Sequence, residues 1–171
     1  MDLTNEEAQI LLNMPKKIIE QDELKNQVIM RTLGRINNRF IIHSLDCNEV
    51  FLMQIKQNRM HLKIDFHFQD NSSHIGLLRV DYNGEHKNPE IANEYVPEIA
   101  LPYTGNIISE SHIHFHVESY KSLAWAVPLN VYDFAIKKMT DGKTFYEATK
   151  EFCRKINLQT EIEFEGQVLF L

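Results

Sequence analysis

The clearest pattern along the chain is a strict alternation of apolar and polar residues over positions 61–69. Its even positions are apolar and its odd positions are polar, and a β-strand places alternate residues on opposite faces. The segment therefore predicts an antiparallel strand with one buried face. Compact apolar runs at 39–42, 50–55 and 75–82 predict further strands. The intervals between them are short and favour sequential hairpins, so residues 27–83 predict an antiparallel meander.

A helical pattern opens the chain. The segment Thr4–Glu7 has the form of a capping box, in which a Thr cap is followed three residues later by Glu. Leu11, Met14 and Ile18 then follow near helical spacing. Pro15 interrupts this pattern, because proline disrupts a helix interior, and it predicts a kink or two short helices.

Two helices are predicted near the C-terminus. Asn130 can cap a helix that runs through Met139, and Thr144–Glu147 forms a second capping box. The helix after this box has an apolar stripe that comprises Phe145, Ala148, Phe152 and Ile156. Residues 161–171 predict a short terminal strand or hairpin.

Together the patterns predict an α+β fold: an antiparallel β-meander sheet with N-terminal and C-terminal helices packed on one face. A chain of 171 residues fits a single domain, 1–171, with a real core. Residues 85–110 interrupt the regular patterns, because they hold three of the five prolines and show little periodicity. We interpret 85–110 as an irregular insertion near the candidate site, and insertions of this length are often functional or mobile.

Composition and charge limit the classes of function. The hydrophobic content of 43% and charged content of 25% are ordinary for a soluble globular protein. The net charge of −6 argues against broad adhesion to DNA or anionic membranes, but not against a local basic patch. Cys47 and Cys153 cannot build a disulfide framework, which suits a reducing cytoplasm. With no signal-peptide pattern and no apolar run of ~20 residues, we expect a cytoplasmic protein without a membrane span.

Three histidines occupy every second position at His112, His114 and His116. A strand would place them on one face, with the intervening Ile113 and its apolar neighbours on the other. Imidazole transfers protons near neutral pH and is a common metal ligand. This strand is therefore the first candidate for a functional site.

A second polar pair, Arg79 and Asp81, lies on one face of the strand predicted at 75–82. If this strand is a neighbour of the histidine strand, a guanidinium, a carboxylate and imidazoles meet on one surface. The residues after Asn83 can fold over its rim, and Trp125 follows shortly after the histidines. The residues expected in catalysis are His112, His114, Asp81 and His86, and those expected to bind ligand are Arg79, Lys87, Asn88 and Trp125.

The leading hypothesis from these residue types is a site for a phosphate-bearing ligand, RNA or a nucleotide. Metal-independent cleavage of a phosphodiester would use His112 and His114 to exchange protons while Asp81 orients one of them. Arg79 or Lys87 would stabilise the negative charge of the phosphate. This mechanism needs no cofactor, and the sequence has no glycine-rich phosphate loop.

Two other interpretations of the histidines stay open. One is a metal site, in which two histidines at i and i+2 bind an ion with Asp81 or His86 as third ligand. Strand geometry separates the Cα atoms of His112 and His116 by ~13 Å, so two histidines with borrowed ligands suit a single ion better than three. The other interpretation is a polar, solvated sheet face that carries histidine by chance.

A different class of function is also open: a non-enzymatic phage or prophage protein that occupies a host protein. The acidic balance of the chain and the 85–110 insertion favour this reading, because an acidic surface can dock on a basic partner. The oligomeric state cannot be inferred from the sequence.

Five groups of short motifs occur in order along the chain: Leu3-Thr4-Asn5-Glu6-Glu7-Ala8 with Leu12, Pro15 and Lys16; Leu78-Arg79-Val80-Asp81 followed by His86-Lys87-Asn88-Pro89; His112-Ile113-His114; Trp125-Ala126-Val127-Pro128-Leu129; and Phe152-Cys153-Arg154-Lys155-Ile156. Through these motifs the chain resembles a family of small bacterial and phage proteins of unknown function. The resemblance implies a cytoplasmic protein and supplies no established activity. It singles out Arg79, Asp81, His86, Asn88, His112, His114 and Trp125.

The chain departs from the pattern of this family at three places. Ser111 stands where the family has proline, and His116 stands where it has tyrosine. The longer segment Glu90–Glu110 replaces a glycine-rich stretch. The resemblance thus lowers the claim of His116 as a functional residue and leaves any ligand contact from the insertion unsupported.

Overall fold

The computed structural model describes residues 3–58 and 63–166, and it has a large antiparallel sheet with two α-helices, as the predicted α+β class requires. In chain order the elements are α1 (Asn5–Asn13), β1 (Lys16–Glu20), β2 (Glu23–Leu24), β3 (Gln27–Met30), β4 (Asn37–Ser44), β5 (Val50–Asn58), β6 (Lys63–Asp70), β7 (Gly76–Tyr82), β8 (His86–Lys87), the 3-10 turn η1 (Leu101–Tyr103), β9 (Ile107–Ile108), β10 (His112–Phe115), β11 (Trp125–Pro128), α2 (Gly142–Lys155) and β12 (Glu161–Phe164).

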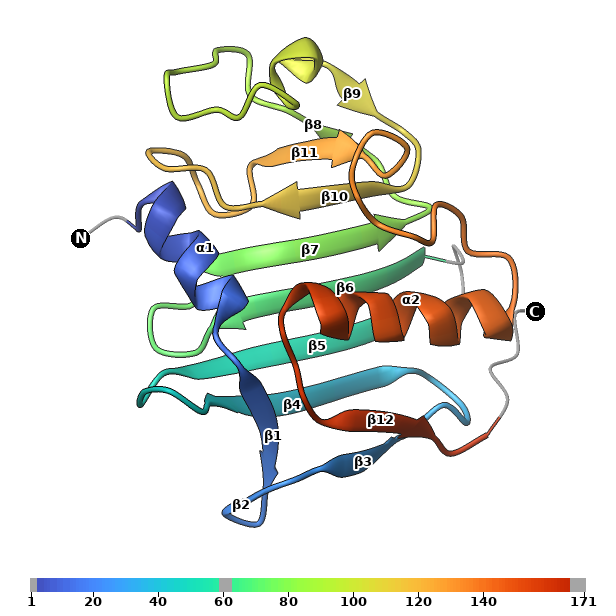
Figure 1. Cartoon of the computed structure of the whole chain (residues 1–171). Helices are drawn as coiled ribbons and strands as arrows, with labels where there is room; N and C mark the ends of the chain where they lie inside the picture. The colour runs from blue at the N-terminus through green and yellow to red at the C-terminus, as the bar shows by residue number, and fades with distance from the viewer. Residues whose placement is uncertain (1–2, 59–62, 167–171) are drawn as a thin grey trace.

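The main sheet has the strand order β11-β10-β7-β6-β5-β4-β1-β2 (Figure 1). Strands β4 to β7 pair in sequence and antiparallel, so the predicted meander is confirmed. Strand β10 then joins the free edge of β7, also antiparallel, after the 85–110 insertion. Two small sheets lie beside the main one: β3 pairs with β12 in parallel, and β8 pairs with β9 antiparallel.

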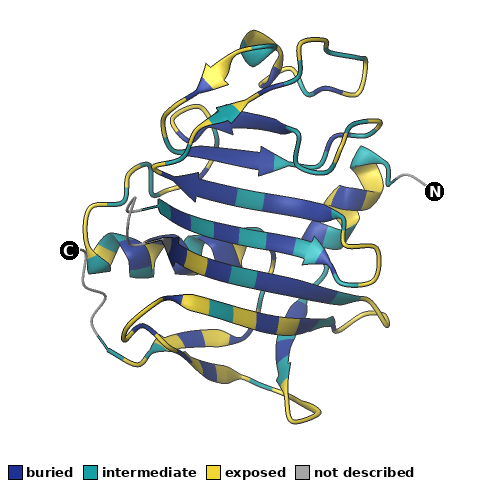
Figure 2. Cartoon of the chain, turned by 180° about the vertical axis from the view of Figure 1, so that it is seen from behind, coloured by how far each residue is buried: buried dark blue, intermediate teal, exposed yellow. Residues whose placement is uncertain are grey.

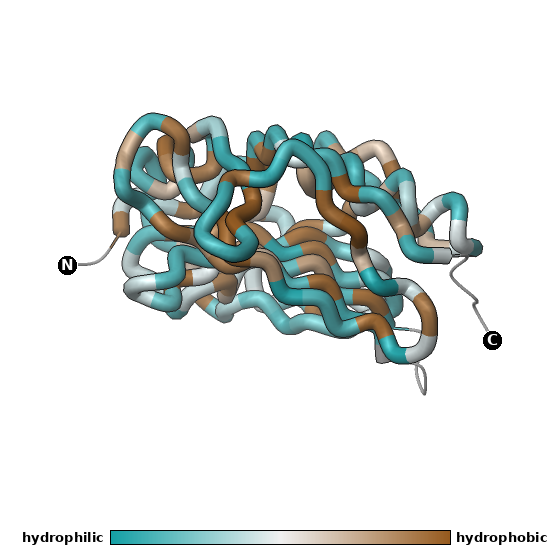
Figure 3. Tube along the Cα trace, turned by 90° about the horizontal axis from the view of Figure 1, so that it is seen from below, coloured by the Kyte–Doolittle hydropathy of each residue, from teal (hydrophilic) through white to brown (hydrophobic). Residues whose placement is uncertain are grey.

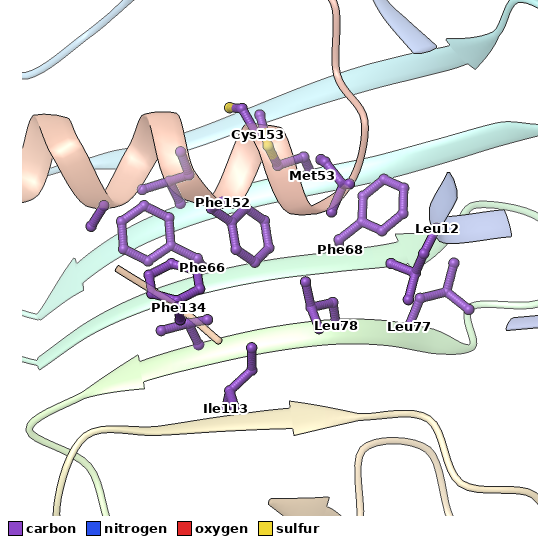
Figure 4. Close-up of a cluster of buried hydrophobic side chains, with 14 of the residues drawn as sticks. Leu12, Met53, Phe66, Phe68, Leu77, Leu78, Ile113, Phe134, Phe152 and Cys153 are labelled. Carbon is purple, nitrogen blue, oxygen red and sulfur yellow. The ribbon is translucent and has the colours of Figure 1, made fainter. Parts of the chain in front are cut away.

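The predicted alternation of β6 is present in the described part of that strand, while His61 and Leu62 lie outside the described residues. Phe66 and Phe68 are fully buried. The Phe66 ring lies 5.5 Å from the Phe152 ring of α2, and Leu12 of α1 joins the same apolar cluster (Figure 4). Figure 1 shows both helices in front of the sheet. The polar residues of β6 lie on the other face of the sheet, which we name the outer face.

The distribution of buried residues agrees with this arrangement of the sheet and helices. The central strands β7 and β10 consist mostly of buried residues (Figure 2). Figure 3 shows hydrophobic segments along the strands in the middle of the view and hydrophilic ones in many surrounding loops. Among the described residues, no helix has the length and apolar character that a membrane crossing needs.

The N-terminal capping box is confirmed, because Thr4 accepts a hydrogen bond from the Glu7 amide and the Glu7 side chain bonds back to the Thr4 amide. The expected kink or second short helix around Pro15 is wrong. The helix ends at Asn13, and the chain continues from Lys16 as strand β1, which pairs with β4. Pro15 ends the helix here because it cannot continue the hydrogen-bonded backbone.

The C-terminal predictions are confirmed in part. Phe145, Ala148, Phe152 and Ile156 are buried as the predicted stripe of α2. The cap of α2 is Asp141, which accepts from the Thr144 amide, so Thr144 is the third helical residue rather than the predicted cap. β12 supplies the predicted terminal strand, and residues 167–171 lie outside the described residues.

The helix predicted from Asn130 to Met139 is wrong, because this segment is irregular. Long-range and local hydrogen bonds occupy its carbonyl groups. The Tyr82 hydroxyl donates to the Ile136 carbonyl, and Lys137 Nζ donates to the carbonyls of Leu129 and Tyr132. These bonds satisfy the backbone without a helix.

Candidate functional site

The two strands that carry the predicted site residues are neighbours. In the β7–β10 pair, His112 stands opposite Asp81 and His114 stands opposite Arg79. Ile113 points to the other face, where it is fully buried in the apolar core. The outer face of the sheet therefore brings together the carboxylate, the guanidinium and two of the three imidazoles.

Asp81, His112 and His114 form a compact buried group, named here the Asp81 cluster. The Nε2 atom of His114 lies 3.3 Å from Asp81 Oδ2, and that of His112 lies 3.5 Å from the same oxygen. One potential ligand atom from each residue falls within 4.8 Å of the other two. The exposed fractions are 3%, 0% and 5% for Asp81, His112 and His114. Only a small surface of the cluster is thus open to solvent.

Backbone carbonyls fix the orientation of both rings. His112 Nδ1 lies 2.7 Å from the Glu110 carbonyl oxygen, and His114 Nδ1 lies 3.0 Å from that of Leu123. A carbonyl can only accept, so each Nδ1 carries the proton, and in a neutral ring Nε2 then has a lone pair. Burial lowers the pKa of His114 despite the raising effect of Asp81, which favours its neutral form at pH 7.

Charges around Asp81 keep its carboxyl group ionised. Arg79 Nε donates to Asp81 Oδ1 at 2.7 Å, and the guanidinium also lies 3.4 Å from Asp65. Burial alone would raise the pKa of Asp81, but His112, His114 and Arg79 hold it well below its usual range. Burial and the neighbouring Asp81 raise the pKa of Asp65 to about 6. The two carboxyl groups thus differ in proton affinity, and Asp81 loses its proton at a lower pH than Asp65.

The insertion brings His86 to the cluster but turns Lys87 away from it. The His86 ring centroid lies 4.4 Å from that of His114 and 6.0 Å from that of His112. His86 Nε2 donates to the Ala124 carbonyl at 2.9 Å, and burial lowers the pKa of His86. Lys87 is exposed, and its ammonium pairs with Glu90 of the insertion.

Asn88 and Trp125 are buried among other protein groups and do not line an open ligand-binding surface. The Asn88 side chain bonds to the backbone amide and carbonyl of Ala126 and to the Tyr103 carbonyl. Trp125 stands opposite Phe115 in the β10–β11 pair, is fully buried and contacts the Tyr120 ring edge-on. Its place is on the core side of the sheet, so Trp125 does not face the Asp81 cluster.

The expectation that three histidines share one strand face is wrong for His116. Strand β10 ends at Phe115, and the His116 amide still bonds to the Leu77 carbonyl of β7 at 3.3 Å before the chain leaves the sheet. His116 Nε2 bonds to the Leu3 carbonyl at 2.7 Å, just before α1. His116 therefore belongs to the contact between the sheet and the N-terminal segment.

Sequence reasoning missed a polar pocket of about 330 Å³ next to the cluster. Arg79 links the two, because it lines the pocket and also binds Asp81. The lining residues are Arg39, Leu52, Gln54, Lys56, Asp65, His67, Gln69 and Arg79. The polar residues at alternate positions of β6 are visible in the sequence. Which side chains they meet depends on the register of β6 with β5 and β7. We name this cavity the outer pocket.

Comparison with known proteins gives a family for most of the chain and no activity. A family model described as "Family of unknown function (DUF6978)" matches residues 3–158. No curated protein and no solved structure matches the chain. The function therefore has to be inferred from the geometry of the site itself.

Proposed function

The chain belongs to the family of unknown function DUF6978, and we propose that it binds a phosphate-bearing ligand, of nucleotide size, in the outer pocket. The observation that carries the proposal is the charge of the lining: Arg39, Lys56 and Arg79 face one carboxylate, Asp65. This local excess of positive charge occurs in a chain of net charge −6. Guanidinium and ammonium groups around a concave site are the usual partners of phosphate.

The size and polarity of the pocket support a nucleotide rather than a long polymer. A volume of about 330 Å³ lies at the lower end of small-ligand sites. Gln54 and Gln69 add amide groups that can hydrogen-bond to a sugar or base. RNA stays an alternative ligand, in which a terminal nucleotide would enter the pocket.

The proposal is confined to binding. Proton exchange by both rings would require a ring nitrogen that reaches the ligand, but each Nδ1 is bonded to a carbonyl and each Nε2 faces Asp81. The burial of His112 and His114 further separates them from a ligand in the pocket. Metal-independent cleavage therefore has no support from this arrangement.

Removal of two pocket cations is expected to weaken phosphate binding about a hundredfold or more, because each hydrogen bond to a charged group contributes about 1.5–3 kcal/mol and about 1.4 kcal/mol is a factor of ten. The test is calorimetric titration in chelator with inorganic phosphate, adenosine monophosphate and phosphate-free adenosine. The variant is Arg39→Gln/Lys56→Gln, and both residues are exposed. The matched control is Lys150→Gln, an exposed lysine on α2.

We expect adenosine monophosphate to bind the unmodified chain and the control equally, with binding that weakens at high salt. Adenosine should not bind. Tighter binding of a 5′-phosphorylated oligonucleotide would identify RNA as the ligand class. Equal affinity of the double variant and the unmodified chain, or no binding of either phosphate compound, would contradict the proposal.

A second candidate function is binding of a protein partner through the 85–110 insertion. Large apolar side chains are exposed there, and five glutamates accompany one lysine. The exposed apolar residues are Ile91, Tyr95, Ile99, Leu101 and Ile107. Exposed apolar patches often mark protein interfaces, and the negative charge favours a basic partner.

The change Ile91→Ser/Ile107→Ser is expected to abolish retention of such a partner, since these side chains are 77% and 60% exposed. Affinity purification from cell extract, followed by a measurement of stoichiometry, tests this. A partner bound one-to-one by the unmodified chain and by a His112→Asn/His114→Asn variant supports the candidate. Loss of the partner in the histidine variant alone argues against it.

A further inference from the structure

The Asp81 cluster contains a buried ring nitrogen, His112 Nε2, that no other atom of the described residues satisfies. Both Nδ1 atoms donate to carbonyls, and both Nε2 atoms point toward Asp81 Oδ2, at 3.3 Å from His114 and 3.5 Å from His112. Among the described residues, His112 Nε2 is a buried polar atom without a hydrogen-bond partner. Buried polar atoms are nearly always satisfied, and an orphan at a functional site points to an unseen partner.

The distances from the two Nε2 atoms to Asp81 Oδ2 indicate whether the missing partner is a proton or a larger cation. A charge-assisted N–H···O hydrogen bond is usually about 2.7–2.9 Å long. The two Nε2–Oδ2 distances, 3.3 and 3.5 Å, are both longer. Ligand atoms that lie ~2.0–2.1 Å from a tetrahedral ion are ~3.3 Å apart, which matches the observed spacing.

We propose that Asp81, His112 and His114 bind one divalent first-row transition-metal ion, of the class of Zn²⁺ or Fe²⁺. Two imidazoles and one carboxylate are ligands that suit these metals better than Mg²⁺ or Ca²⁺. The ligand atoms converge within 4.8 Å, and all three residues are buried. Three protein ligands leave a coordination position for water or a ligand oxygen, as in catalytic zinc sites.

Neighbouring groups hold the three ligands in the orientation that a metal requires. The carbonyls of Glu110 and Leu123 fix each ring so that Nε2 faces Asp81. Arg79 Nε binds the other carboxylate oxygen, Oδ1, and leaves Oδ2 for the ion. Such outer-shell bonds are a regular feature of metal-binding histidines and carboxylates.

This inference goes beyond the proposed phosphate binding and does not depend on it. Arg79 connects the two sites, because it lines the outer pocket and holds Asp81. An ion in the cluster would add positive charge beside the pocket and could polarise a phosphoryl oxygen that reaches it. The metal test uses no phosphate compound, and the phosphate test uses chelator, so either proposal can fail alone.

The direct experiment is metal titration of the full chain, purified without a metal column and stripped with chelator. Co²⁺ is the probe, because its visible spectrum reports the ligands, and Zn²⁺ is the competitor. We expect saturation at one Co²⁺ per chain and displacement by Zn²⁺. Absence of saturable binding of either ion at one equivalent would overturn the proposal without any variant.

Variants place the ion in the cluster. Asp81→Asn and His114→Asn should each lower metal affinity about 100-fold or more, a loss at or above the upper end of the outer-shell effects. His43→Asn is the matched control, because His43 lies on the outer face of β4 and belongs neither to the Asp81 cluster nor to the lining of the outer pocket. The control should bind metal as the unmodified chain does. Unchanged affinity in both cluster variants would overturn the assignment.

A second measurement decides the case if the cluster variants fail to fold. Nitrogen-15 NMR of the unmodified chain separates the two ring nitrogens of each histidine. On addition of Zn²⁺, the Nε2 signals of His112 and His114 should shift while their Nδ1 signals stay protonated. Shifts confined to other histidines would place the ion elsewhere and overturn the proposal.

Discussion

Lys16→Met is expected to lower the free energy of unfolding by about 3 kcal/mol at pH 7.5, because two buried carbonyls and one partly buried carbonyl lose their donor. The Lys16 side chain is fully buried, and its ammonium donates to the carbonyls of Leu12, Met14 and Ile156 at 2.9, 2.6 and 2.9 Å. These carbonyls end α1 and α2, so one lysine amino group satisfies the ends of both helices. Urea unfolding followed by circular dichroism measures the loss.

The same lysine predicts a pH dependence. Burial lowers the pKa of Lys16 from 10.5 to about 7. Between these values the unfolded chain binds more protons than the folded chain, so this group makes stability rise with pH through that window. Lys16→Met removes the contribution, and the difference between the two proteins should therefore be larger at pH 9.5 than at pH 7.5.

The matched control for this prediction is Lys17→Met. Lys17 is the next residue of β1, is partly exposed and donates to Asn26 rather than to a helix end. Its replacement should change stability by no more than about 0.5 kcal/mol. Equal stability changes in the two variants, or no loss in Lys16→Met, would show that the ammonium does not join the two helices.

How much of this fold is predictable depends on whether the information is local. The alternation over 63–69 predicts β6 because each polar residue lies on the outer face and each apolar residue enters the core. The capping box at Thr4 is likewise a short-range pattern. The helix prediction for residues 130–139 is wrong because Tyr82, far away in the sequence, binds the Ile136 carbonyl. No local pattern contains that contact.

The candidate site is likewise predictable where it depends on local patterns but not where it depends on contacts between distant segments. The residue types of Arg79, Asp81, His112 and His114 are visible in the sequence, but their meeting depends on β10 returning to the edge of β7 after the insertion. The strand period also places His116 with the other rings, and only the end of β10 at Phe115 separates it. The outer pocket forms only in the observed register of three strands, so the sequence pattern alone does not predict it.

Asn88→Ala is expected to destabilise the chain by about 2 kcal/mol and to loosen the insertion around the site. The Asn88 side chain is 2% exposed and makes three hydrogen bonds, two with Ala126 and one with the Tyr103 carbonyl. It thereby continues the edge of β11 in place of a backbone partner. Alanine would leave the buried amide and carbonyl of Ala126 without this partner, at about 1 kcal/mol each, while the Tyr103 carbonyl keeps the Asn106 amide.

Local measurements separate this effect from a general loss of stability. Amide hydrogens of β8 and β9 should exchange faster in Asn88→Ala than those of β5 and β6, because only the insertion loses its anchor. Burial lowers the pKa of His86, which precedes Asn88 by two residues, so release of the insertion should move that pKa back toward its ordinary value. An NMR pH titration of the His86 ring follows this change.

The matched control is Asn106→Ala, in the same insertion. Asn106 is exposed and donates to the Pro102 carbonyl, so its replacement should cost less than about 1 kcal/mol and leave His86 unchanged. If Asn88→Ala behaves like this control, the side chain does not anchor the insertion. If it loses stability while the pKa of His86 stays low, the insertion is instead held over the Asp81 cluster by the histidine rings themselves, which lie within 4.4 and 6.0 Å.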